Sequence, residues 1–211
     1  MVKYVKENYQ KNLEAIIETL EGVPRLLLHA CCAPCASRAI EVLSPYFEID
    51  IVFYNPNIQP AEEYEKRRLE LVRLLSLMPC RNKVRLLDGP WEEEDFTRAA
   101  LGYEMEPEGG ERCSRCFELR LMETGRLALT GNYDYFATTL TVGPRKNAET
   151  INEIGFAAAE KLGVEWLPAD FKKQDGYLRS VELSEKYGLY RQQYCGCVFS
   201  KITGKVIEDS V

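Results

Sequence analysis

A short apolar run that ends in three closely spaced cysteines constrains the fold more than any other stretch of this chain. The run, Leu26 to Ala30, leads directly into Cys31-Cys32-Ala33-Pro34-Cys35. Because it follows a glycine and a proline and is too short for a buried helix, residues 23–30 are predicted to form a buried strand. A helix is predicted from Ala36 to Leu43, with the proline near its first position. The cysteines therefore lie at a strand-to-helix turn, where open α/β sheets bind ligands and where a helix N-terminus favours thiolate over thiol.

Strand and helix patterns alternate along the rest of the chain. Strands are predicted at Val23–Ala30, Glu48–Tyr54, Lys83–Leu87, Tyr133–Leu140 and Val164–Leu167. Helices are predicted at about Lys3–Glu21, Ala36–Leu43, Pro60–Met78, Glu111–Leu129, Asn147–Leu162 and Ser180–Tyr187, and Trp91–Gly110 is predicted to be irregular with a short helix. This order is typical of an α/β fold, a Rossmann-like open, mostly parallel five-stranded sheet with helices on both faces and a cysteine-bearing C-terminal tail. We expect residues 1–211 to form a single domain with its metal and redox site at the carboxyl ends of the strands.

The composition favours a cytoplasmic enzyme. Of 211 residues, 45% are hydrophobic and 28% charged, which is ordinary for a soluble globular protein. A net charge of −6 argues against a protein that coats nucleic acid without specificity, although a local basic patch is compatible with it. No apolar run is long enough to suggest a membrane span, and the N-terminus lacks the apolar core of a signal peptide.

Seven of the eight cysteines lie in three tight clusters, which favours metal ligation or redox chemistry over structural disulfides. Cys113 and Cys116 form a C-x-x-C at a helix start, where both sulfur atoms lie on one helix face. Alone, this motif is compatible with a thioredoxin-like redox pair or half of a zinc site. With Cys31, Cys32 and Cys35 it offers five thiolates, more than the four that close a zinc site or hold an iron–sulfur cluster.

The third cluster is Cys195-Gly196-Cys197. A disulfide across one intervening residue is strained and easily reduced, which suits electron transfer, although the two thiols could equally bind a metal. The remaining cysteine, Cys80, is interpreted as ordinary packing, and a structural role for His29, the single histidine, is at least as well supported as a role as ligand or proton donor.

Two aspartates and a set of cations are further candidates. Asp134 precedes the fourth strand and Asp170 follows the fifth, so each could supply an oxygen ligand or an acid, or simply be a cap or a solvated side chain. The turn after the fourth strand offers hydroxyls and cations at a helix N-terminus, which suits phosphate. The candidate substrate-binding residues are Thr138, Thr139, Arg145, Lys146, Lys172, Lys173 and Arg191. A solvated charged face is the alternative interpretation.

Together these stretches resemble the QueH family of epoxyqueuosine reductases. The matching pieces are Leu28–Cys35, Arg112–Arg120, Phe136–Leu140, Asp170–Lys173 and Leu189–Cys197, which span nearly the whole chain. The resemblance implies an enzyme of the last step of queuosine biosynthesis. Such an enzyme removes the epoxide oxygen of epoxyqueuosine at the wobble position of the tRNA anticodon, with electrons from a separate donor.

The same resemblance implies a 4Fe-4S cluster and a second iron beside it. Carried onto this chain, the cluster ligands would be Cys31, Cys32, Cys113 and Cys116. Cys195 and Cys197 would be a redox-active pair or ligands of the second iron, and Cys35 with Asp134 or Asp170 would complete that second site. On this interpretation Cys195, Cys197, Asp134 and Asp170 are the candidate catalytic residues.

Two unlike alternatives remain open. A zinc-stabilised RNA-binding module would use the thiolates to hold the fold and the cations to bind the RNA backbone. A generic dithiol oxidoreductase would use only the redox pair. A nucleotide-dependent tRNA-modifying enzyme is disfavoured, because cysteines replace the glycine-rich phosphate loop after the first strand.

Overall fold

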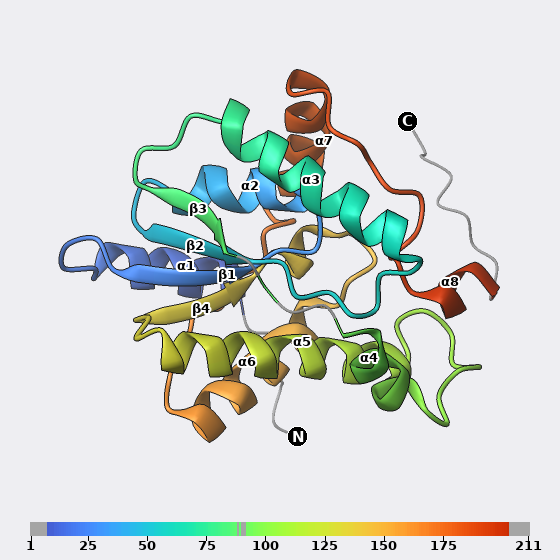
Figure 1. The fold of residues 1–211 in the computed structure, drawn as a ribbon. Helices are drawn as coiled ribbons and strands as arrows, with labels where there is room; N and C mark the ends of the chain where they lie inside the picture. Colours follow the sequence, from blue (N-terminus) through green and yellow to red (C-terminus); the bar gives the residue numbers. More distant parts are fainter. Residues whose placement is uncertain (1–7, 88, 90–91, 203–211) are drawn as a thin grey trace.

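The computed structural model describes residues 8–87, 89 and 92–202, and its centre is a five-stranded parallel sheet between two layers of helices (Figure 1). The strand order is β3-β2-β1-β4-β5. The strands are β1 (Arg25–His29), β2 (Glu48–Val52), β3 (Val84–Leu87), β4 (Tyr135–Thr138) and β5 (Glu165–Trp166). Every neighbouring pair is parallel, so the predicted fold class is confirmed.

Helices cover both faces of the sheet. They are α1 (Tyr9–Glu18), α2 (Ala33–Leu43), α3 (Ala61–Leu77), α4 (Glu93–Ala100), α5 (Glu111–Thr130), α6 (Ala148–Leu162), α7 (Gly176–Lys186) and α8 (Val198–Ile202), with a 3-10 turn η1 (Leu140–Val142). In Figure 1, α2 and α3 lie above the sheet and α5 and α6 below it. No helix in the described part of the chain is long and apolar enough to cross a membrane.

Alternating side chains of β1 hold the two layers together. Leu26 and Leu28 are buried against α1, α2 and α3, whereas Leu27 is buried with residues of α5 and α6. Because successive side chains of a strand point to opposite faces, this central strand has no solvent-exposed face and is apolar throughout. The aliphatic run in the sequence is explained by this position.

The crevice at the carboxyl ends of β1 and β4 is the topological switch point of the sheet. From β1 the chain continues to β2 on one side, while β4 and β5 lie on the other. The Cys31–Cys35 turn follows β1, and the Thr138–Lys146 turn follows β4. Parallel α/β sheets bind ligands at such points, so both predicted site segments lie at the expected place.

The structure confirms the short helix predicted within Trp91–Gly110, which is α4, and differs from the sequence prediction in other local details. Trp91 lies outside the described residues, as do the first residues of the predicted N-terminal helix. The short helix α8 was not predicted. On α3 the apolar Val72 is 44% exposed, whereas the charged Arg67 is buried. Arg67 is buried because the C-terminal segment covers it and accepts its hydrogen bonds.

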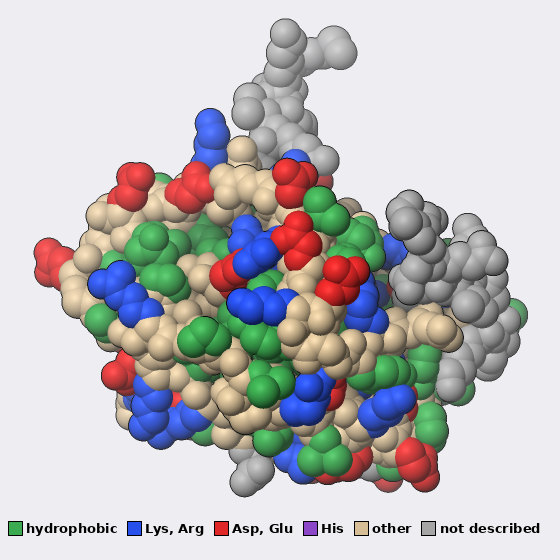
Figure 2. All heavy atoms as spheres, turned by 90° about the horizontal axis from the view of Figure 1, so that it is seen from above, with side chains coloured by type: hydrophobic (Ala, Val, Ile, Leu, Met, Phe, Trp, Pro, Cys, Tyr) green, Lys and Arg blue, Asp and Glu red, His purple; other side chains and the backbone are tan. Residues whose placement is uncertain are grey.

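The surface over α3 and α7 carries basic, acidic and apolar side chains intermixed (Figure 2). No large patch of one charge dominates this face, which fits the modest negative net charge of the chain. The local basic patch with which the sequence is compatible does not lie on this face.

A buried carboxylate links β2 to its neighbours, and its removal is expected to destabilise the fold. Asp50 accepts hydrogen bonds from Arg85 Nη2 at 2.7 Å and from Tyr133 Oη at 2.6 Å. Burial raises the pKa of Asp50, but these partners outweigh it and hold that pKa below its usual value. We expect Asp50→Asn to lower the free energy of unfolding by about 1–3 kcal/mol at neutral pH.

The effect of Asp50 should depend on pH with a defined sign. A depressed folded-state pKa stabilises the protein above the unfolded-state pKa of about 3.9 and loses that effect as the pH falls through the folded value. In urea denaturation, the gap between wild type and Asp50→Asn should therefore shrink below about pH 4. A gap that stays constant from neutral to acid pH would contradict this assignment.

Candidate metal and redox site

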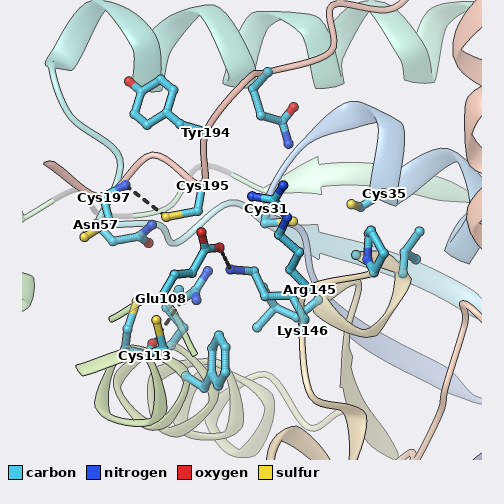
Figure 3. Close-up of a pocket in the computed structure, with 18 of the residues that line it drawn as sticks. Cys31, Cys35, Asn57, Glu108, Cys113, Arg145, Lys146, Tyr194, Cys195 and Cys197 are labelled. Carbon is cyan, nitrogen blue, oxygen red and sulfur yellow. Dashed lines mark hydrogen bonds and ion pairs between the residues drawn. The ribbon is translucent and has the colours of Figure 1, made fainter. Parts of the chain in front are cut away.

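A cavity of about 160 Å³ opens at the carboxyl ends of the strands, and six cysteines line it (Figure 3). The six are Cys31, Cys35, Cys113, Cys116, Cys195 and Cys197. The seventh, Cys32, adjoins them, with its sulfur 3.8 Å from that of Cys31. The eighth, Cys80, packs instead against the core under α2 and α3, as predicted. The cavity thus gathers all three cysteine clusters of the sequence.

The first cluster lies at the N-terminus of α2. The sulfur atoms of Cys31, Cys32 and Cys35 all lie within 4.8 Å of one another, and Cys32 occupies the N-cap position. Hydrogen bonds from Cys32 and then Cys35 hold the pKa of Cys31 well below its usual value, whereas the pKa of Cys32 rises to about 12 and that of Cys35 is also raised well above its usual value. The three sulfur atoms thus share one negative charge. Such a group binds a metal ion when the remaining protons leave.

The second cluster starts α5, across the cavity. Gly109 N donates to Cys113 Sγ at 3.2 Å, and Cys116 is buried one helical turn later, where burial raises its pKa. Arg112, between the loop and the helix, donates to the carbonyl oxygens of Glu104 at 2.7 Å and of Glu106. This buried guanidinium therefore fixes the loop that leads into the C-x-x-C.

The third cluster is docked on the loop that follows β2. Gln59 N donates to Gly196 O at 3.0 Å, and Tyr194 Oη donates to Gln59 O at 2.6 Å. Arg67 donates to the carbonyl oxygens of Tyr194 and Cys195 at 3.1 and 3.2 Å. The C-terminal segment is therefore held over the cavity by contacts with Gln59 and Arg67 that involve neither cysteine side chain.

The two thiols of this segment differ in protonation. A hydrogen bond from Cys197 lowers the pKa of Cys195 well below its usual value, since it and the charge of Lys146 outweigh burial. The pKa of Cys197 is raised by the same hydrogen bond and by burial. Cys195 is therefore the thiolate and Cys197 the thiol of a pair that shares one proton.

Gly196 is expected to be essential for this docking. Its φ is +105°, and a Cβ there would lie 2.7 Å from Ile58 Cγ1 and 3.2 Å from Ile58 Cα. Gly196→Ala should therefore shift both cysteines, and displacement of reacting groups by about 1 Å can cost about 100-fold in rate. Gly22→Ala is the matched control, because Gly22 has φ +82° but a methyl group added there would meet nothing within 4 Å. Equal turnover in the two variants would contradict this role.

The predicted substrate-binding residues fall into three groups. Arg145, Lys146 and Arg191 line the cavity, where Lys146 pairs with Glu108 at 3.3 Å. Thr138 contacts His29, and Thr139 Oγ1 accepts a hydrogen bond from Cys31 N, so these hydroxyls support the cysteine turn.

Lys172 and Lys173, the two remaining predicted cations, form the third group. Lys172 donates to Lys146 O at 2.9 Å and pairs with Asp170 at 3.1 Å, so its ammonium group is engaged with the chain itself. Lys173 is exposed.

The two candidate aspartates lie apart. Asp134 Oδ2 accepts from Arg25 N at 2.7 Å, at the amino end of β1. Because β1 spans five residues at about 3.3 Å each, the structure does not bring Asp134 to the cysteines. Asp170 lies at the carboxyl end of the sheet, after β5, and is buried against Lys172. Of the two, only Asp170 is at the edge of the sheet that carries the cavity.

His29 is buried beneath the cysteine turn. Its Nε2 lies 3.0 Å from Tyr54 O, which can only accept, so Nε2 carries the proton and Nδ1 accepts from Thr138 Oγ1 at 2.8 Å. Burial, with the charge of Arg120, lowers the pKa of His29 to about 4. The neutral imidazole therefore links β1 to β4 and to the segment that follows β2, through its two hydrogen bonds.

Several residues of the cavity were not predicted as functional. They are Asn57, Arg67, Glu108, Arg112, Arg120 and Gln192. Arg112 and Arg120 flank the C-x-x-C on its two sides, and this spacing could have indicated them. Asn57 and Glu108 lie in loops whose sequence carries no comparable signal.

The donor set fits a thiolate-bound metal centre. Soft thiolates select zinc, copper(I) and iron–sulfur clusters over hard cations, and the cavity brings thiols from both predicted ligand segments to one space. The fold and this cavity define an α/β protein with a cysteine-rich cavity, a candidate metal or redox site, at its topological switch point.

Comparison with known proteins identifies the family. A family model described as epoxyqueuosine reductase QueH matches residues 26–203. A relative of that name from Staphylococcus epidermidis is 42% identical over 208 residues, which cover 94% of this chain and 87% of the relative. A relative of the same name from Streptococcus pyogenes is 39% identical, over an alignment that covers 92% of this chain and 78% of the relative. Another from Thermotoga maritima is 37% identical, over an alignment that covers 83% of this chain and 89% of the relative. The chain belongs to the QueH family of epoxyqueuosine reductases.

Proposed function

We propose that this chain is an oxidoreductase that removes the epoxide oxygen of epoxyqueuosine at the wobble position of a tRNA anticodon. The observation that carries the proposal is the convergence of seven cysteines, from three separate segments, on one cavity. The substrate is inferred from the family to which the chain belongs. Neither a structural zinc site nor a single dithiol needs seven thiols in one place.

The reaction sets the requirements for the site. Converting an epoxide to an alkene breaks both C–O bonds, forms the C=C bond and releases water, which takes two electrons and two protons. Oxidation of the Cys195 thiolate and Cys197 thiol to a disulfide releases two electrons and one proton. An external electron-donor protein then returns two electrons and a proton to restore the pair.

Lys146 supplies the second proton in this proposal. Burial lowers the pKa of its ammonium, but the negative charges of Cys195, Glu108 and Cys113 outweigh burial and raise it. The group is therefore protonated at neutral pH and lies in the cavity, where Glu108 orients it. Donation from Nζ to the departing oxygen avoids the release of an unstabilised alkoxide, and solvent water then returns a proton to Nζ.

A 4Fe-4S cluster is the cofactor that we propose for the cavity, held by Cys31, Cys32, Cys113 and Cys116. When bound, it would carry, one at a time, the electrons that return the Cys195–Cys197 pair to its reduced form. Cys35 lies within 4.8 Å of Cys31 and Cys32 and is the remaining thiol for a second iron, with Asp170 the better placed of the two aspartates. The shared thiolate at the start of α2 supports this assignment, because metal binding replaces protons on such a group.

The RNA is proposed to approach the rim of the cavity. Arg145 is exposed there and has no hydrogen bond or ion pair with the described residues, so it is available for a phosphate. We expect Arg145→Gln to weaken binding of an anticodon stem–loop RNA and to reduce the slope of log Kd against log salt by about 1. Lys83→Gln, an exposed lysine before β3, is the control and should leave the slope unchanged. An unchanged slope in Arg145→Gln would place the RNA surface elsewhere.

The proposed function is tested by direct assay. Protein prepared without oxygen is mixed with dithionite and an anticodon stem–loop that carries epoxyqueuosine, and the nucleosides are analysed by mass spectrometry. The expected product has lost one oxygen atom and matches queuosine. Unchanged epoxyqueuosine with fully metal-loaded protein would contradict the proposal and favour the RNA-binding module.

A further inference from the structure

Two buried amide oxygens in the cavity have no hydrogen-bond partner among the described residues. They are Oδ1 of Asn57 and Oε1 of Gln192, and both residues line the cavity. Asn57 is only 3% exposed. An unpaired buried amide oxygen is destabilising, so a folded protein retains one mainly where water, an ion or a ligand completes the hydrogen bond.

Asn57 is held rigidly in place. In the same loop, Asn55 Nδ2 donates to Ala30 O at 2.8 Å and Ile58 N donates to Asn55 O at 3.0 Å. The next residue but one, Gln59, is bound through its backbone to Gly196. These contacts fix the backbone of the loop on both sides of Asn57 and so fix the position from which its side chain reaches the cavity wall.

The unpaired oxygens lie beside the redox pair. Figure 3 shows Asn57 on the side of the cavity that carries Cys195 and Cys197. Gln192 precedes the same pair by three residues in the docked C-terminal segment. The nearby guanidinium of Arg67 is already engaged by carbonyl oxygens and Glu63. The two amide oxygens therefore have no donor among the described residues, and a ligand that enters the cavity can supply one to each.

The chemistry of this wall of the cavity defines that ligand. The cyclopentane ring of epoxyqueuosine carries two hydroxyl groups beside the epoxide. Hydroxyls are donors that match acceptor oxygens on one wall of the cavity.

We propose that Asn57 Oδ1 and Gln192 Oε1 accept hydrogen bonds from the ring hydroxyls and so select the hydroxylated cyclopentane ring. The inference rests on the proposed function and adds the residues that determine specificity. Because a site built to pair a hydroxyl leaves its own polar group unsatisfied when that hydroxyl is absent, it discriminates strongly against analogues without it.

The inference is tested by equilibrium binding without turnover. The probes are an anticodon stem–loop that carries queuosine, the product with both hydroxyls, and the same RNA with only an aminomethyl group on the base. Asn57→Leu and Gln192→Leu should each weaken binding of the queuosine RNA by about 10-fold or more, with binding of the ring-free RNA unchanged. Asn57→Asp, which keeps an acceptor oxygen, should retain the preference for the ring.

Controls separate this role from folding and metal binding. Asn82→Leu, in the turn before β3, has no side-chain hydrogen bond in the described structure and should bind both RNAs as the wild type does. Urea midpoints and iron content of the Asn57 variants should match those of the wild type. Equal weakening of both RNAs, loss of iron, or an unchanged preference for the ring would each overturn the inference.

The proposed function fails in a different way. If the wild type itself binds both RNAs equally and gives no queuosine in the turnover assay, the function is wrong. If the wild type prefers the ring and turns over while both leucine variants behave identically to it, only the role of Asn57 and Gln192 is wrong.

Discussion

Cys31→Ser is expected to empty the metal site and to lower epoxyqueuosine reduction by at least about 1000-fold. Cys31 is the low-pKa member of the group at the start of α2, with its sulfur 3.8 Å from that of Cys32. A serine hydroxyl is not deprotonated at neutral pH and is a poor ligand for soft metals. The measurement is iron and sulfide content together with single-turnover rate.

Cys80→Ser is the matched control for Cys31→Ser. It also replaces one thiol, but Cys80 lies outside the cavity against the hydrophobic core. It should keep wild-type iron and turnover, with at most a modest loss of stability. Full iron content and normal turnover in Cys31→Ser would contradict the assignment of this cluster.

Cys197→Ser is expected to separate metal binding from chemistry. Cys197 is the protonated member of the Cys195–Cys197 pair, so its loss prevents disulfide formation while the other clusters stay intact. We expect turnover to fall at least about 100-fold and iron and sulfide to stay at the wild-type level. Reduced RNA binding is not expected, because the backbone of this segment remains docked through Gln59 and Arg67.

The opposite outcome for Cys197→Ser is equally informative. A loss of iron from the protein would show that the C-terminal pair ligates metal, as the resemblance also allows. Unchanged turnover with unchanged iron would contradict both roles. The chemistry would then depend on the first two clusters alone.

The layered fold could be predicted because its signals are local. The aliphatic run of β1 and the apolar spacing along α5 and α6 show which faces of these elements are buried. The pattern of buried faces in turn indicates a central strand covered by helices. Local signals fail where contacts between distant segments determine which residues are buried. Arg67 is buried on α3 only because the C-terminal segment, far away in sequence, covers it.

The cysteines of the candidate site could be predicted from the sequence, but the positions of its polar residues could not. Cysteine spacing carries the chemistry of a thiolate site, so the three clusters were recognisable before their meeting in one cavity was visible. Asp134 illustrates the limit. Its position just ahead of a strand indicated a site, yet a parallel strand places its first residue at the edge of the sheet opposite its last. Likewise, Lys172 looked available for RNA, but it binds backbone carbonyls.

The most direct test of the central claim is the iron and acid-labile sulfide content of the protein purified without oxygen, measured with its absorption spectrum. Seven cysteines around one cavity predict about four or more irons, matching sulfide and a broad brown absorption band. Zinc without sulfide in a colourless protein would contradict the account and indicate a zinc-stabilised RNA-binding module.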